Sequence, residues 1–106
     1  MKRRTDRGWY LVWLAGAPWI LRYTVKSLCA MEARAGMPLE RLMNRQFSAT
    51  RLLLWAGLCQ DYPKLTVWDA GELICKHLQR GGSLEDVIEA CAEGLRASGL
   101  IDGEAS

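Results

Sequence analysis

Residues 48–62 read Ser48-Ala-Thr-Arg-Leu-Leu-Leu-Trp-Ala-Gly-Leu-Cys-Gln-Asp-Tyr62 and predict a helix with almost no polar face. Between Leu52 and Cys59 the run holds no charged or amide side chain. A helix that is apolar nearly all round is buried on every side. We therefore predict that this helix, which Ser48 caps and Pro63 stops, is the centre of the domain.

Two amphipathic helices are predicted after the central one. Thr66 and Asp69 approximate a capping box for the first, which the glycine pair at 81–82 ends, and Ser83 and Asp86 open the second. Charged side chains of the second helix gather opposite its apolar face. The apolar positions at helical spacing are Val67, Ala70, Ile74, Cys75 and Leu78 in the first helix, and Leu84, Val87, Ile88, Cys91, Ala92 and Leu95 in the second.

The amino-terminal third predicts a β-hairpin and two further helices. Two aromatic-rich runs, residues 9–14 and 18–23, flank an Ala-Gly-Ala-Pro turn. Because both faces of the hairpin are apolar, we expect each to be covered, by helices or by a partner. Thr24 is the predicted cap of a helix that Gly36 ends, and Pro38 suits the start of a short helix over residues 38–44. The fold is thus expected to be mainly α, a compact bundle of about four to five helices with a small N-terminal β-hairpin.

The 106 residues suffice for one domain, and the balance of half apolar and a quarter charged residues is that of a folded protein. We expect a basic flexible arm at 1–7, the domain at 8–101 and a polar tail at 102–106. The arm and the uncharged run 8–21 together imitate a signal peptide. The run is too short to span a membrane, and its aromatic load and turn favour a folded segment. No membrane contact is expected.

Side chains for catalysis or metal binding are sparse. The single histidine, His77, lies at the edge of a predicted helix, and the carboxylates Glu85, Glu89 and Glu93 read as a solvated helix face. Four cysteines lack metal-ligand spacing, and each falls on the apolar side of a predicted helix, which indicates reduced thiols in the cytoplasm. We expect no enzyme, no cofactor and no metal.

Five tryptophans are an excess for a domain of this size. Exposed aromatic rings concentrate at protein-binding surfaces. We therefore expect some of these rings to face a partner or a second copy of the chain, so that a homodimer through the apolar hairpin is plausible. The predicted contact residues are Trp13, Trp19, Trp55 and Trp68.

Two stretches resemble phage tail assembly chaperones of the gene-transfer-agent type. The first is Leu14-Ala-Gly-Ala-Pro-Trp-Ile-Leu-Arg-Tyr-Thr-Val-Lys-Ser-Leu-Cys-Ala-Met-Glu-Ala-Arg-Ala-Gly36, in which Glu32 and Gly36 stand at the family's acidic and glycine positions. The second is Leu53-Leu-Trp-Ala-Gly-Leu-Cys-Gln-Asp-Tyr-Pro-Lys-Leu-Thr66, which is similar to a helix ending in Ala-Gly-Leu and followed by Pro-x-Leu-Thr. Together the matches span residues 12–80.

The resemblance implies a prophage-encoded tail morphogenesis protein in the host cell cytoplasm. Its expected partner is the tape-measure or tail tube protein, bound non-covalently until the tube polymerises. The basic amino end and the aromatic first strand depart from the family pattern. The alternative is a small DNA-binding regulator with a helix-turn-helix between Phe47 and Ile74. Asp69 and Glu72 on its recognition helix would repel phosphates, so nucleic acid is not the partner we expect.

Overall fold

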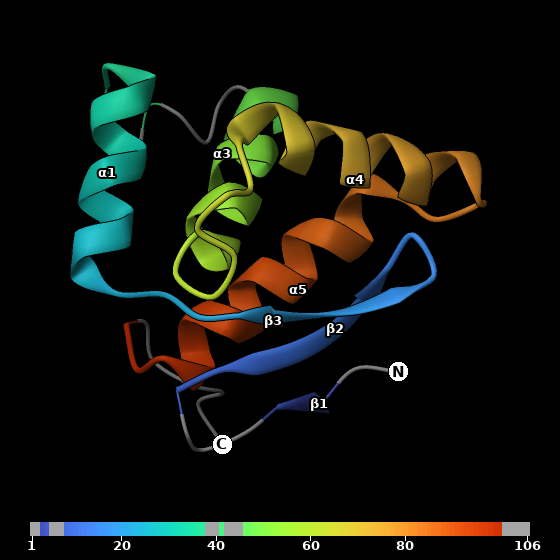
Figure 1. Ribbon diagram of the computed structural model, residues 1–106, viewed down its shortest axis with the longest axis horizontal. Helices are drawn as coiled ribbons and strands as arrows, with labels where there is room; N and C mark the ends of the chain where they lie inside the picture. Colours follow the sequence, from blue (N-terminus) through green and yellow to red (C-terminus); the bar gives the residue numbers. More distant parts are fainter. Residues whose placement is uncertain (1–2, 5–7, 38–40, 42–45, 101–106) are drawn as a thin grey trace.

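A computed structural model of the chain describes residues 3–4, 8–37, 41 and 46–100. The mainly helical fold with an amino-terminal hairpin is confirmed (Figure 1). The short helix predicted over 38–44 lies outside the described residues apart from Arg41. The elements in chain order are β1 (Arg3–Arg4), β2 (Tyr10–Leu14), β3 (Ala17–Leu21), α1 (Val25–Ala35), α3 (Gln46–Leu58), α4 (Val67–Gln79) and α5 (Leu84–Ala97).

The three strands form one antiparallel sheet in the order β1-β2-β3. The helices all lie on one side of this sheet (Figure 1), and the side chains on that face, such as Val12 and Leu14, are buried. The pairs Leu11↔Ile20 and Trp13↔Pro18 form the other face, on which Trp13 is 44% exposed. Among the described residues the helices thus cover one face only, and cover of the other face by a partner stays a prediction.

The hairpin turns through Ala15 and Gly16, whose φ angles are 55° and 80°. Two left-handed residues in a two-residue loop make a type I′ turn, which matches the twist of the flanking strands. The outer edge of β3 is closed to further strands. Pro18 has no N–H, the N–H of Ile20 donates to the Tyr62 hydroxyl at 3.2 Å, and that of Arg22 donates to the Gly57 carbonyl at 2.8 Å.

Helix α3 is the centre of the fold, as its sequence predicts. All residues from 52 to 58 are buried, and the helix contacts α1, α4, α5 and β3. Its boundaries differ from the prediction. The helix starts at Gln46, so Ser48 lies inside its first turn and is not a cap, and it ends at Leu58. Beyond that end Tyr62 turns towards β3, where its ring packs edge-on against Trp19 with centroids 5.0 Å apart.

The other helix ends follow the predicted signals. Thr24, Thr66 and Ser83 each accept a hydrogen bond from the backbone N–H three residues on, and each site is a complete capping box. Gly36 ends α1 in the left-handed conformation, with φ 69°. These caps are local interactions, which explains why the sequence alone could locate them.

Tyr23 joins the sheet to the helices. Its ring lies between Gly57 of α3 and Gly94 of α5, where any Cβ would meet the ring at 2.7 Å and 3.0 Å respectively. The hydroxyl donates to the Leu53 carbonyl at 2.6 Å, and the backbone N–H donates to the Ser98 hydroxyl at 3.0 Å. Complete burial raises the pKa of the phenol well above 10, so this hydroxyl stays a donor.

Candidate protein-binding surface

The four tryptophans predicted to contact a partner differ widely in exposure. Trp68 at the start of α4 is 75% exposed, and Trp13 on the outer face of the sheet is 44% exposed. Trp19 is half-buried, and its indole N–H donates to the Leu14 carbonyl at 3.2 Å. Trp55 is buried in α3, at 8% exposure. The structure therefore offers two of the four rings, Trp13 and Trp68, as accessible aromatic surface.

Phe47 is a further exposed ring, which the sequence analysis did not select. It lies in the first turn of α3 and is 66% exposed. The prediction that Ser48 caps this helix leaves Phe47 outside it. A helix starting two residues earlier puts Phe47 one turn from Arg51, at the i, i+4 spacing that brings side chains onto the same face. That spacing is the signal by which the sequence could have revealed it.

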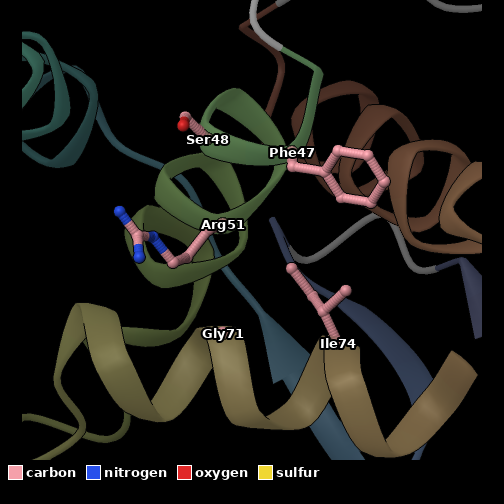
Figure 2. Close-up of a pocket in the computed structure, with 5 residues that line it drawn as sticks. All are labelled: Phe47, Ser48, Arg51, Gly71 and Ile74. Atoms are coloured by element: carbon pink, nitrogen blue, oxygen red, sulfur yellow. The ribbon is translucent and has the colours of Figure 1, made fainter. Parts of the chain in front are cut away.

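A hollow of about 170 Å³ lies between α3 and α4. Figure 2 shows Phe47 on α3 at one end of it, the Arg51 side chain extending towards the other, and Ile74 pointing up from α4. Gly71 lies on the side of α4 that is turned to α3, and a Cβ there would stand 3.1 Å from Cδ of Arg51. We call this space, which Ser48 also lines, the α3–α4 hollow.

Arg51 connects the α3–α4 hollow to Trp68. Its guanidinium lies over the Trp68 ring, with Cζ 5.0 Å from the ring centroid, which is a cation–π contact. Its Nε is shielded from solvent and has no hydrogen-bond partner among the residues that the structure describes. An unsatisfied buried donor costs free energy, roughly 1–3 kcal/mol. Arg51 is thus held by stacking and lacks an acceptor at one of its donors.

A second hollow, of about 340 Å³, lies beside the connection from α3 to α4. Two of its lining residues are in contact: the guanidinium of Arg34 from α1 stacks over the Trp55 ring, with Cζ 4.5 Å from the ring centroid. Trp68 borders this hollow and stacks with Arg51 of the first, so the two hollows meet at this ring. The remaining lining residues are Cys59 and residues 63–67.

Among the described residues, each charged side chain that lines either hollow is a cation: Arg34, Arg51 or Lys64. The two exposed rings Phe47 and Trp68 stand among them. We call the set Phe47, Arg51, Trp68, Arg34 and Lys64 the aromatic–arginine surface. Its apolar rings and cationic side chains can take up apolar side chains and anionic groups.

The only histidine forms a two-residue pair away from this surface. His77 Nε2 lies 3.0 Å from Oδ2 of Asp86, between the end of α4 and the start of α5. The backbone N–H of Ser83, and then the His77 ring, hold the pKa of the Asp86 carboxyl below its usual 3.8. Among the described residues no group of three or more His, Cys, Asp or Glu side chains could hold a metal ion.

The prediction that all four cysteines lie on apolar helix faces is wrong for two of them. Cys29 and Cys75 are exposed, Cys59 is half-buried and Cys91 is buried, and all four thiols are free. Cys75 lies on the solvent side of α4, although its spacing from Ile74 suggested an inward position. Burial raises the pKa of Cys91 to about 12, so this thiol is an inert core residue.

The carboxylates of α5 behave largely as a solvated face. Glu85 and Glu89 are exposed, while Glu93 is half-buried and pairs with Arg96 at 3.2 Å. Burial, and then the nearby charges of Glu93 and Glu89, raise the pKa of the Tyr10 hydroxyl. None of these groups forms part of the aromatic–arginine surface.

The helices proposed for the DNA-binding alternative are joined by residues 59–66. A helix-turn-helix uses a turn of about 3–4 residues, so this connection is about twice that length. On α4 the exposed acids Asp69 and Glu72 accompany the exposed bases Lys76 and Arg80. This mixture of charges lacks the dense positive face that a phosphate backbone selects.

No helix in the described part of the chain has the length and hydropathy needed to cross a membrane. Comparison of the sequence with protein-family models and with curated proteins, and of the structure with solved structures, gives no match.

Proposed function

We propose that the protein binds another protein non-covalently through the aromatic–arginine surface, as a tail assembly chaperone binds the tape-measure protein. The observation that carries the proposal is the exposure of Phe47 and Trp68, at 66% and 75%: Phe47 lines the α3–α4 hollow, and Trp68 lines the second hollow and stacks with Arg51. The sequence resemblance over residues 12–80 supplies the identity of the client. The site of action is then the cytoplasm of the host cell.

In this mechanism an amphipathic segment of the client lays its apolar face on α3 and α4, as in helix-in-groove recognition. Covering either exposed ring removes on the order of 100–150 Å² of apolar surface from water, which is worth roughly 2.5–4 kcal/mol before ordering costs. Two such anchors supply roughly 5–8 kcal/mol before those costs, less than the ~8.2 kcal/mol of a micromolar complex, so further contacts along the segment must contribute the rest. A client held in this way can be released when the tube subunits compete for the same segment.

The test is co-expression with the tape-measure protein of the same phage or prophage. The long protein should stay soluble and co-purify only when this chain is present. The double variant Phe47→Ala/Trp68→Ala should reduce the recovered complex at least tenfold without changing the far-UV circular dichroism of the chain. Val25→Ala is the matched control, because Val25 is 65% exposed on α1, outside the aromatic–arginine surface.

The proposal fails if the tape-measure protein neither gains solubility nor co-purifies. It also fails if the double variant and the Val25→Ala control bind equally well. Binding to duplex DNA that falls steeply with salt would instead favour the regulator alternative.

The outer face of the hairpin is the proposed contact for a homodimer. Trp13 is 44% exposed there beside the exposed Pro18, and no described helix covers this face. Sedimentation equilibrium should then give a dimer for the wild type and a monomer for Trp13→Ser. A wild type that stays monomeric at high micromolar concentration would remove this part of the proposal.

A further inference from the structure

We infer that the aromatic–arginine surface selects an acidic amphipathic segment, placing a large apolar side chain in the α3–α4 hollow and an Asp or Glu carboxylate on the Arg51 guanidinium. The inference rests on the proposed protein-binding function and names the chemistry of the partner, which that function leaves open. Three features of the surface carry it: an unsatisfied donor, a one-sided charge and an apolar lining.

The unsatisfied donor is Nε of Arg51, which is shielded from solvent and finds no acceptor in the described part of the chain. The side chain as a whole is only half-buried, and its guanidinium is held by the Trp68 ring at 5.0 Å. A carboxylate arriving at the hollow would offer the planar guanidinium an acceptor in the geometry that it favours. Binding of an acid would therefore add both a hydrogen-bond acceptor and an opposite charge to the guanidinium, whereas an uncharged side chain would add no charge and an amine would repel it.

The charge of the lining is one-sided. Arg51 lines the first hollow, and Arg34 and Lys64 line the second, and no acidic side chain from the described part of the chain lines either. Acidic groups on the same helix stand apart from the hollows, since Asp69 is engaged by the Thr66 N–H at 2.9 Å and Glu72 is exposed but lines neither space. Complementarity of charge then favours acidic residues in the partner and disfavours basic ones.

The apolar lining argues for a protein partner and against a nucleic acid. Phe47, Ile74 and the methylene groups of Arg51 form most of the α3–α4 hollow, which matches an aliphatic or aromatic side chain. Three cations are too few for a phosphate backbone, whose recognition needs a denser positive face, and Glu72 would oppose it. An amphipathic helix meets both requirements, because residues at i and i+4 put an apolar anchor and an acid on one side.

A display selection of random 16-residue peptides against the immobilised full chain tests this inference. The enriched peptides should carry Asp or Glu three or four residues from Leu, Ile, Met, Phe or Trp, and should be depleted of Lys and Arg. The affinity of the best peptide, measured by fluorescence anisotropy, should be about tenfold or more lower for Arg51→Gln than for the wild type, since the variant loses a hydrogen bond to a charged group. Arg51→Lys should lose most of the same affinity, because lysine lacks the planar fork.

Lys76→Gln is the matched control, as it removes one positive charge from an exposed position on α4 that lines neither hollow. It should leave the peptide affinity within about twofold of wild type. The indole N–H resonance of Trp68 should shift on titration, whereas that of Trp19, which is bonded to the Leu14 carbonyl, should not. Enriched peptides without acidic residues, equal loss in Arg51→Gln and Lys76→Gln, or a selection without enrichment would each overturn the inference.

The outcome is separable from that of the proposed function. If the tape-measure protein binds through Phe47 and Trp68 but is insensitive to Arg51→Gln, the function stands and the acidic selectivity is refuted. If acidic peptides bind in an Arg51-dependent way and the tape-measure protein does not bind, the selectivity stands and the client identity is refuted.

Discussion

Replacing Gly57 with alanine should destabilise the protein, although alanine is the better helix former. The backbone of α3 approaches the sheet closely at this point, and an added Cβ would stand 2.7 Å and 2.8 Å from Cζ and the hydroxyl of Tyr23 and 2.9 Å from Cδ2 of Leu21. Real Cβ contacts are essentially never this short, so the ring or the helix must move.

The magnitude follows from two opposing terms. Overpacking of a closely packed core costs about 1–3 kcal/mol, and the exchange of Gly for Ala inside a helix returns about 1 kcal/mol. Tyr23 cannot easily give way, since its hydroxyl is held by the Leu53 carbonyl at 2.6 Å and Gly94 confines the ring from α5. The cost should lie in the upper part of its range, so we expect a net loss of about 2 kcal/mol, or a fall in Tm of roughly 10 °C.

The assay is urea denaturation followed by circular dichroism, with Gly71→Ala as the matched control. At Gly71 an added Cβ would meet only the Arg51 side chain, at 3.1 Å and 3.7 Å, and that side chain can shift. The control should therefore gain roughly 0.5 kcal/mol from helix propensity. If Gly57→Ala is as stable as Gly71→Ala, the position of the Tyr23 ring between Gly57 and Gly94 does not limit packing, and the reasoning is refuted.

Three further predictions concern the turn, the acid sensitivity and the thiols. Ala15→Asn should raise the free energy of unfolding by about 0.5–1 kcal/mol, because alanine is strained at φ 55° and asparagine is not; an unchanged urea midpoint would count against the type I′ turn. Asp86→Asn should have a lower free energy of unfolding than the wild type, and this difference should be greatest above pH 3.8, where the Asp86 carboxylate is ionised. The difference should shrink as pH falls through the lowered pKa of Asp86, and a difference independent of pH would contradict the pairing of Asp86 with His77 and Ser83. Native protein treated with a thiol reagent should be labelled first at Cys29 and Cys75, and at Cys91 only after unfolding; mass spectrometry that finds rapid native labelling of Cys91 would contradict its burial.

The candidate site could be predicted only in part. Sequence composition pointed to exposed aromatic rings, and Trp68 is one of them. The sequence does not show that Trp55 is buried whereas Trp68 is exposed, because the burial of Trp55 depends on the elements that surround α3. Phe47 and Arg51 were not predicted as site residues because the hollow that they line forms only where α3 meets α4. No local sequence pattern shows which face of one helix contacts which residue of another.

Sequence alone determined the features that depend on neighbours in the chain: the three capping boxes, the left-handed stop at Gly36, the hairpin turn and the apolar run of α3. These arise from hydrogen bonds and φ preferences within a few residues. Only the tertiary structure decided which hairpin face is covered, where α3 ends and which cysteines are exposed. Each of these depends on close packing between distant segments, such as Tyr62 against β3, and such packing overrides local preference because it buries far more surface than any single turn.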